Sequence, residues 1–479
     1  MNFNLVVIGS GLSSLSFIDS YLEKNRKIDV ISPDFYHQEI EETPKNSHLY
    51  NDKNLPPQMR YNLGKIKNYF FFNDFVVQKN TNIMGSLEFG GLSNYWGLQI
   101  DKNISNDIKC LAKKDNKRLQ KSFLEICNKL SLIGEITLNQ KNFKNDFKVD
   151  ESFTNLINKK KIKKFSVTKP ILAISNNKRL KNNTSNKKVD LNSIKENLNK
   201  VTAKNYYNKF LRKKNIRFHN YVVKKIFLKQ NKIKIICANK TKTKVFYAKK
   251  IVFGCGTLVT TKLIIDSLKI KKEIKIKEHP RMLSLFFSKY KIENYMDFMP
   301  SQMQIRDDTH QKSFLVDFRP GNKFIINTAL KMYKFLFPFK FLLYLFRNYM
   351  IFSNILLDSK YSNVFMKIKN DSNISLYSKN KNTFSVLKKK HKKIFNLLRS
   401  EKLVLPIYKN FFSGHGSAYH YFGTIPIGAK NKKLSVNNLC QLKNFKNVYI
   451  IDGSVFDFKI NKYPLGLVMA NARRVAKEI

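Results

Sequence analysis

The segment that decides the fold is NLVVIGSGLSS, residues 4–14. It begins as an apolar strand and passes directly into a Gly-x-Gly-x-x-Ser spacing between Gly9 and Ser14. Apolar residues at helical spacing in residues 15–24 predict a helix, and residues 27–32 (KIDVIS) predict a second strand. Strand, glycine turn, helix and strand in this order are typical of a βαβ unit in a parallel sheet.

This glycine turn predicts a site for the pyrophosphate of a dinucleotide. Gly9 permits a tight turn, Gly11 lets the backbone approach the phosphates, and the small Ser14 lets helix and strand pack closely. Leu12 and Ser13 open the helix, whose unpaired N–H groups and dipole favour phosphate. A glycine turn that only joins packed elements is the alternative. The position of the turn directly after a strand favours the dinucleotide site.

The acidic residue that should bind the adenosine ribose is not at its usual place after the second strand. Ser32 occupies that position. Asp34 lies two residues later and could reach a ribose hydroxyl, whereas Asp29 lies inside the strand and could simply face solvent. Asp34 is therefore the candidate ribose ligand.

Length and composition predict two closely associated domains with a strongly basic surface. The chain has 479 residues, 43% of them hydrophobic, which exceeds what one core usually supports. The net charge of +55 comes from 89 Lys and Arg against 34 Asp and Glu, and it attracts phosphate, anionic lipid or acidic glycan. The basic residues are spread over the whole chain, so the filling of solvated positions is the plainer interpretation. No specific nucleic-acid partner is expected.

The cysteines and the N-terminus predict a cytoplasmic protein without a metal site. The five cysteines lie far apart, with no C-x-x-C pair and no zinc-ligand spacing. The N-terminus has no basic leader followed by a small-residue cleavage site. We therefore expect a reduced compartment and no export.

One segment, Phe335–Leu357, has membrane character. Pro338, Lys340 and Arg347 interrupt its apolar run, and charges near the middle of a span are costly. The segment therefore predicts an interfacial helix rather than a spanning one, and a peripheral contact with the anionic inner face of a membrane.

The rest of the chain alternates between polar and structured stretches. Residues 101–200 are rich in Lys and Asn, and 176–188 read as an exposed loop. Residues 216–268 predict several strands, a second strand-to-helix glycine turn and a helix. Residues 281–410 are aromatic-rich and predict a second domain that covers the first. The last 50 residues return to strand, turn and helix.

Five motifs resemble the glucose-methanol-choline (GMC) oxidoreductase family. The C-terminal signature reads HYFGTIPIG (420–428) followed by YIIDGSV (449–455) and a final helix. Upstream, GGLSNYWG (90–97), FGCGTL (253–258) and EHP (278–280) resemble the family's second glycine-rich flavin contact, its second strand-to-helix turn and its Asp-His-Pro. Several separate motifs in the family's order identify the chain as a member.

The resemblance implies an α/β fold with two parts. The first is a Rossmann-type FAD-binding domain, discontinuous in sequence, over residues 1–100, 200–280 and 430–479. The second is an α+β substrate-binding domain built on a sheet, over residues 101–199 and 281–429.

The resemblance also implies FAD as the cofactor and assigns contacts to it. It assigns the pyrophosphate contacts to Gly9, Gly11, Leu12, Ser13 and Ser14, and the adenine contact to Val223. It places Gly90, Gly91, Ser93, Asn94 and Gly256 near the flavin. It assigns the ribityl-phosphate contacts to Asp452 and Gly453, and it places Pro464 and Leu465 at the isoalloxazine.

The resemblance implies the oxidation of a CH–OH group, with hydride transfer to flavin N5 and His420 as the general base. A histidine suits this proton transfer because its ordinary pKa lies near neutral pH; a purely structural His420 is the alternative. The family's second active-site residue, usually His or Asn, falls on Tyr463, whose hydroxyl can orient an alcohol but is a poor base. Either Tyr463 keeps the oxygen-binding role, or the pair is broken.

Three functions are compatible with this sequence. The first is an FAD-dependent oxidoreductase acting on a small alcohol or sugar, including a lipid-linked one, with an unknown electron acceptor. The second is a GMC-like flavoprotein with lyase-type, non-redox chemistry. The third is a flavin-free basic protein that binds membranes or other anions. Intact glycine turns at separate places in the chain favour the first two.

Overall fold

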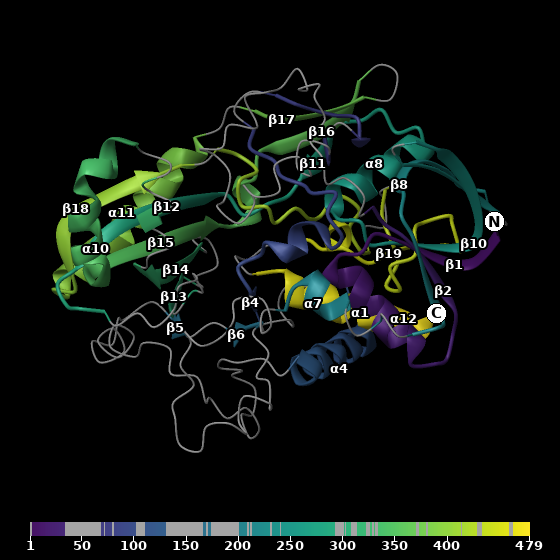
Figure 1. Cartoon of the computed structure of the whole chain (residues 1–479), viewed down its shortest axis with the longest axis horizontal. Helices are drawn as coiled ribbons and strands as arrows, with labels where there is room; N and C mark the ends of the chain where they lie inside the picture. The colour runs from purple at the N-terminus through teal and green to yellow at the C-terminus, as the bar shows by residue number, and fades with distance from the viewer. Residues whose placement is uncertain are drawn as a thin grey trace.

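The computed structural model of the chain places four sheets with helices packed around them (Figure 1). It describes residues 2–33, 69–70, 72–78, 81–101, 111–130, 166–168, 171–173, 201–207, 210, 213–229, 232–239, 241–292, 301, 303–307, 314–321, 326–327, 330, 334–369, 373–379, 382–412, 414–428, 434–458 and 463–479.

The largest sheet contains the predicted βαβ unit. Its order is β7-β2-β1-β10-β9-β8, and β19 also pairs with β10. The pairs β7–β2, β2–β1, β1–β10 and β10–β19 are parallel, while β9 joins its two neighbours antiparallel. The strands are β1 (Asn2–Ile8), β2 (Ile28–Ile31), β7 (Ile216–His219), β8 (Val222–Phe227), β9 (Ile233–Ala238), β10 (Thr243–Phe253) and β19 (Val448–Ile450).

Helices bring distant parts of the chain onto this sheet. Helix α1 (Leu12–Leu22) packs against α12 (Leu465–Glu478), so the two ends of the chain lie side by side (Figure 1). Helix α4 (Lys113–Leu130) packs on α12, α7 (Ala203–Tyr207) on α1, and α8 (Thr257–Ser267) on β8. Arg473 of α12 forms ion pairs with Glu23 and Glu125, which join these helices.

A four-stranded and a six-stranded sheet follow along the long axis of the molecule (Figure 1). The first has the order β11-β16-β17-β3, and the second β18-β12-β15-β14-β13-β5, with every pair in it antiparallel. A two-stranded sheet joins β4 to β6. The strands are β3 (Phe75–Val77), β4 (Gln99–Ile100), β5 (Ser166–Thr168), β6 (Ile171–Leu172), β11 (Ile274–Ile276), β12 (Arg281–Ser288), β13 (Met303–Asp307), β14 (Phe314–Pro320), β15 (Met350–Leu357), β16 (Val364–Ile368), β17 (Ile374–Ser378) and β18 (Val404–Phe411).

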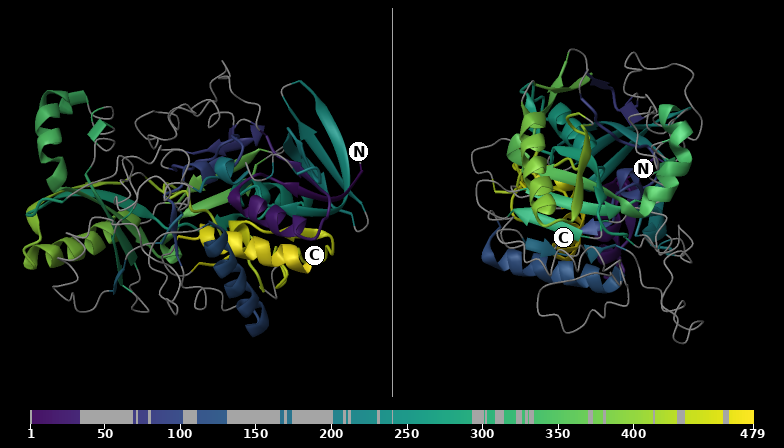
Figure 2. Two further views of the ribbon diagram at one scale, coloured as in Figure 1. Left: turned by 60° about the horizontal axis from the view of Figure 1, so that its bottom comes forward. Right: turned by 90° about the vertical axis from the view of Figure 1, so that its left-hand side faces the viewer.

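The six-stranded sheet carries helices on both faces (Figure 2). Phe286 of β12 packs toward Phe395 of α11 (Thr383–Ser400), because alternate strand residues face opposite sides. Its neighbours Leu285 and Phe287 pack with Leu343 of α10 (Lys340–Leu345) on the other face. The large sheet and the six-stranded sheet thus have separate apolar clusters. The α/β class predicted from the sequence is confirmed, and the two domain boundaries stay predictions.

The segment Phe335–Leu357 is not the single helix predicted from the sequence. Residues Lys334–Phe339 form a 3-10 helix, α10 and a second 3-10 turn (Phe346–Tyr349) follow, and β15 begins at Met350. The last eight residues pair with β12 and β14, because a short apolar run fits a buried strand as well as a helix. No helix among the described residues is long and apolar enough to cross a membrane.

Asp29 was also expected to face solvent, and it does not. Its side chain is buried and accepts hydrogen bonds from Arg217 Nε at 2.9 Å and Nη2 at 3.1 Å. His219 Nε2 lies 2.8 Å from the same carboxylate. Asp29 therefore holds β7 beside β2. The predicted ribose ligand Asp34 and the predicted loop 176–188 lie outside the described residues.

Candidate active site

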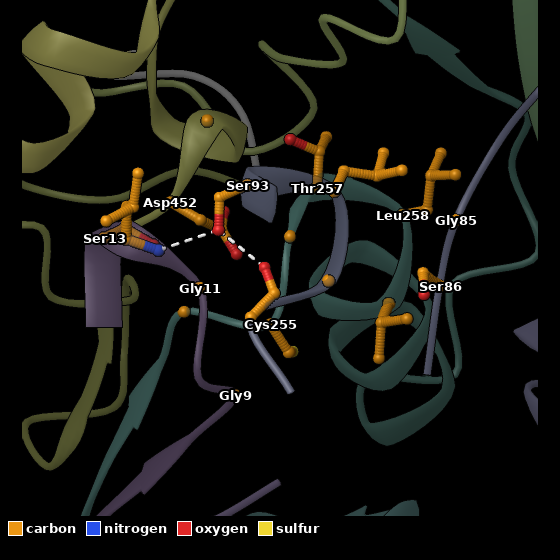
Figure 3. A pocket seen from close by; sticks show the side chains of 18 of the residues that line it. Gly9, Gly11, Ser13, Gly85, Ser86, Ser93, Cys255, Thr257, Leu258 and Asp452 are labelled. Atoms are coloured by element: carbon orange, nitrogen blue, oxygen red, sulfur yellow. Dashed lines mark hydrogen bonds between the residues drawn. The ribbon is translucent and has the colours of Figure 1, made fainter. Parts of the chain in front are cut away.

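Turns from four separate parts of the chain enclose one cavity of about 280 Å³. They are the turn after β1, residues 84–97, the turn after β10 and the segment that ends in α12. Figure 3 shows Gly9, Gly11 and Cys255 in neighbouring turns, with Thr257 and Leu258 at the start of the next helix. The parallel strands β1 and β10 end at the same edge of the sheet, so their turns meet there.

Three helices begin at this cavity. Gly11 precedes α1, Gly256 precedes α8 and Pro464 precedes α12, and all three line the cavity. The first turns of these helices carry no acidic side chain. Helix N-termini carry partial positive charge and unpaired N–H groups, so this arrangement favours an anionic ligand such as a diphosphate.

Hydrogen bonds tie the first glycine turn to the second. The Leu12 N–H donates to Ser93 Oγ at 3.1 Å, and Ser93 Oγ donates to the Gly90 carbonyl at 2.5 Å (Figure 3). The Gly90 N–H in turn donates to Ser10 Oγ at 2.8 Å, which lies 2.6 Å from Ser32 Oγ. Ser32, found where an acidic residue was expected, thus belongs to a serine network that fixes both turns.

Most of the residues predicted from the sequence line this one cavity. They are Gly9, Gly11, Leu12, Ser13, Gly90, Gly91, Ser93, Val223, Gly256, His420, Asp452, Gly453, Tyr463, Pro464 and Leu465.

Ser14 and Asn94, also predicted as contacts, do not line the cavity. Ser14 Oγ donates to the Gly254 carbonyl at 3.1 Å, so it joins α1 to β10, the packing role expected of a small residue there. Asn94 Nδ2 donates to the Phe89 carbonyl at 2.6 Å, while its Oδ1 accepts from the Lys204 N–H at 3.2 Å. The Asn94 amide therefore joins the turn to α7 through hydrogen bonds outside the cavity.

Asp452 fixes the turn between β19 and the segment that leads to α12. Its side chain accepts hydrogen bonds from the Ser454 N–H at 3.0 Å and from Thr260 Oγ1 of α8. Burial raises the pKa of Asp452, although the hydrogen bonds from Ser454 and Thr260 oppose the shift. Gly453 lies so close to the Tyr421 carbonyl that a Cβ would stand 2.7 Å from it. Asp452 thus joins its turn to α8, and Gly453 brings that turn against the segment that carries His420.

Gln99 lines the cavity and was missed in the sequence analysis. It is 1% exposed, and neither its Oε1 nor its Nε2 has a hydrogen-bond partner among the described residues. A buried amide without partners is costly, so this one is placed to bind a polar ligand group. Trp96, in the preceding turn, lines the same wall and donates from Nε1 to the Val201 carbonyl at 2.9 Å. The only sequence signal for Gln99 was its place directly after that glycine-rich turn.

His420 lies at the end of the cavity nearest the six-stranded sheet, with its ring 5.5 Å from that of Tyr463 and 6.0 Å from that of His279. Its Nδ1 is buried without a hydrogen-bond partner among the described residues. Burial lowers the pKa of His420 to about 4, the nearby Arg281 charge adds to the shift, and Asp317 opposes it. His420 is therefore neutral at pH 7 and can accept a proton.

Tyr463 is held by a buried network from the six-stranded sheet. Its hydroxyl donates to Asp317 Oδ2, and the same carboxylate accepts from Arg319 Nε at 3.1 Å and from Asn354 Nδ2 at 3.2 Å. Burial, and then the Asp317 charge, raise the pKa of Tyr463. The Tyr463 hydroxyl is thus no base. Because its proton points to Asp317, its oxygen can accept a hydrogen bond from a substrate hydroxyl.

Glu278 supports the segment that carries His420 and was not predicted to act there. It is fully buried, and its Oε1 accepts a hydrogen bond from the Gly416 N–H at 2.7 Å. Tyr421 makes a second tie, since its hydroxyl donates to the Gly416 carbonyl at 3.0 Å and accepts from the Met84 N–H at 2.8 Å. Tyr419 between them has a left-handed φ of 61°, a strained conformation of the kind found at functional sites.

Glu278 makes the stability of this segment depend on pH. Burial raises the pKa of Glu278 from 4.5 to about 7, although hydrogen bonds from the Gly416 and Ala418 N–H groups oppose the shift. The carboxyl group stabilises the fold fully below pH 4.5, and this contribution is lost as pH rises toward 7, because the unfolded chain releases the proton first. We therefore expect Glu278→Gln to reduce the loss of unfolding free energy between pH 5 and pH 8 by about 2 kcal/mol.

Denaturant unfolding of both proteins at the two pH values measures this difference. Glu278→Asp is the matched control, because it keeps a titratable carboxyl and should keep the loss. Equal pH dependence in Glu278→Gln and the unmodified protein would show that the buried carboxyl does not titrate in this range.

The comparison with known families agrees with this arrangement. The family model for the C-terminal part of the GMC oxidoreductases matches residues 379–472, which include α11, the His420 segment, Asp452 and the first half of α12. No match is found among the curated proteins. This match supports membership of the chain in the GMC oxidoreductases, a family of flavin enzymes whose members generally bind FAD.

Proposed function

We propose that this oxidoreductase uses FAD to oxidise the CH–OH group of a small alcohol or sugar, with His420 as the general base. The observation that carries the proposal is the position of His420. A neutral histidine and a tyrosine line the same cavity as several glycine turns and the N-termini of three helices.

Open space beside two of the glycine turns supports the binding of FAD in this cavity. A Cβ added to Gly256 would meet no atom within 4 Å, and one added to Gly11 would meet none closer than 3.7 Å. Both positions therefore leave room for a ligand to approach the backbone. Gly9 to Ser13 would hold the pyrophosphate, Val223 the adenine, and Gly90, Gly91, Asp452 and Leu465 the flavin half. The partnerless amide of Gln99 adds a polar contact on that side.

Different side chains at this end of the cavity would carry out different steps of alcohol oxidation. Bound FAD would take up the two electrons from the alcohol carbon. His420 would take the hydroxyl proton, because burial keeps its ring neutral at pH 7. Tyr463 would accept a hydrogen bond from a second donor group of the substrate and fix its orientation, because the reacting hydroxyl gives its one proton to His420 and Asp317 holds the Tyr463 hydroxyl in place. Proton removal and substrate orientation are thus assigned to different side chains.

Absorbance spectroscopy of the purified protein tests this function. We expect a flavin band in the blue that bleaches anaerobically with one class of alcohol and not with others. FAD that no alcohol or sugar reduces would favour a lyase-type use of the cofactor. A protein that neither contains FAD nor takes it up would contradict the proposal.

A further inference from the structure

The most exposed apolar surface of the described residues surrounds α10, and we call it the α10 patch. Its seven side chains are between 46% and 76% exposed, and they are Phe335, Phe337, Phe339, Phe341, Leu342, Leu345 and Phe346. Soluble proteins rarely expose an apolar patch of this size unless it binds something. The α10 patch therefore needs an occupant.

The patch lies at one end of the molecule, where a large partner surface can reach it. Figure 1 places α10, α11 and β18 together at the end of the molecule farthest from both chain termini. Leu343 and Tyr344 pack inward against the six-stranded sheet, which leaves the phenylalanines of the segment pointing outward. Ile407 on β18, 60% exposed, extends the patch, because its neighbour Tyr408 packs on Phe395 of α11 on the opposite face.

The charge around the patch identifies the occupant. Lys340 and Arg347 lie within the segment, and the exposed Lys409 lies on the neighbouring strand. Residues 318–357 contain no Asp or Glu, and the whole chain carries a net charge of +55. Aromatic and aliphatic side chains flanked by basic ones match a bilayer whose headgroups are anionic, since the apolar groups enter the acyl boundary while the cations meet the phosphates.

We propose that the α10 patch docks this protein on an anionic lipid bilayer. Phe335, Phe337 and Phe341 enter the interface, and Lys340 and Arg347 contact the headgroups. The docking is peripheral and reversible, because α10 and its flanking turns are too short to span.

Vesicle flotation tests the docking. The full-length protein is mixed with phosphatidylcholine vesicles with and without phosphatidylglycerol, and the bound fraction is measured at low and high salt. We expect binding to the anionic vesicles, weaker binding to the neutral ones, and partial loss in salt. The triple variant Phe335→Ser, Phe337→Ser and Phe341→Ser should bind anionic vesicles on the order of 100-fold more weakly. Its three positions are at least 64% exposed, so folding should not change.

A matched control removes exposed apolar side chains elsewhere. Leu124→Ser with Phe227→Ser, at positions 44% and 41% exposed on α4 and β8, should bind like the unmodified protein. Equal binding by the triple variant would overturn the proposal, because the net charge alone would then explain the attraction. The proposal would also be overturned if the unmodified protein did not bind vesicles. A dimer in sedimentation that the triple variant loses would overturn it too, because the patch would then join two copies of the chain.

Discussion

Replacing His420 with Asn is expected to slow the reduction of bound FAD by alcohol about a hundred- to ten-thousand-fold, while the FAD content stays unchanged. His420 is the histidine of the cavity, and the hydroxyl of its neighbour Tyr463 has a raised pKa and donates its proton to Asp317. Among the described residues that line the cavity, His420 is therefore the one imidazole that can take the proton at pH 7. Stopped-flow absorbance under anaerobic conditions measures the reduction rate, and the visible spectrum measures bound flavin.

The pH profile separates this role from a structural one. Because burial lowers the pKa of His420 to about 4, its ring stays neutral and active from pH 8 down to pH 6. A solvent-exposed histidine would lose activity near pH 6.5. We therefore expect the reduction rate of the unmodified enzyme to be flat across this range. A rate that falls with an apparent pKa near 6.5 would contradict the environment described for His420.

His415 provides the control for this experiment. It lies five residues earlier in the same segment, but it does not line the cavity, and burial lowers its pKa as well. In the His415→Asn variant, alcohol should therefore reduce the bound FAD at close to the original rate. If His415→Asn lost the activity and His420→Asn kept it, the assignment of the base would be wrong.

The sequence predicted the parts of the site that depend on local backbone. A strand followed by a glycine turn and a helix is encoded within about a dozen residues, and the turns at Gly9 and Gly256 formed as expected. Both glycines have positive φ, at 102° and 84°, a backbone conformation that other residues rarely adopt. The position of the start of α12 beside the cavity was instead implied by the resemblance to the GMC family.

The side chains that support the site could not be predicted, because their partners are distant in sequence. Glu278 binds Gly416 and Tyr463 binds Asp317, pairs separated by 138 and 146 residues. Nothing in either local sequence reports the other partner. Gln99 was missed for a related reason, since its lack of partners appears only when the surrounding walls are in place.

In the apolar run Phe335–Leu357, the spacing of apolar residues did not predict the secondary structure correctly. Its residues suit a helix or a buried strand equally well, and tertiary pairing decided between them. The second part joined β12 and β14 as β15. The first part pairs with no strand among the described residues and forms the short helices of the α10 patch. The interfacial role predicted from its composition stays a prediction, which the vesicle experiment tests.

Gly9→Ala and Gly11→Ala are expected to fail in different ways, although both lie in the same turn. A Cβ on Gly9 would stand 2.6 Å from Cys255 Cα and 2.7 Å from the Gly254 carbonyl, in a backbone with φ of 102°. Both neighbours are backbone atoms that cannot move without separating β1 from β10. We therefore expect Gly9→Ala to lose about 3 kcal/mol or more of unfolding free energy.

Gly11→Ala should instead fold normally and bind FAD on the order of 100-fold more weakly. Its φ of −65° suits alanine, and the added methyl would meet Ser93 Oγ at 3.7 Å, an ordinary contact. The methyl would stand in the cavity at the place where the pyrophosphate approaches the backbone. Thermal unfolding of the two apoproteins and FAD titration by flavin fluorescence measure the two effects separately. Full FAD affinity in Gly11→Ala would place the pyrophosphate elsewhere. A stable Gly9→Ala would contradict the close packing of this turn, so one variant tests the cofactor contact and the other tests the fold around it.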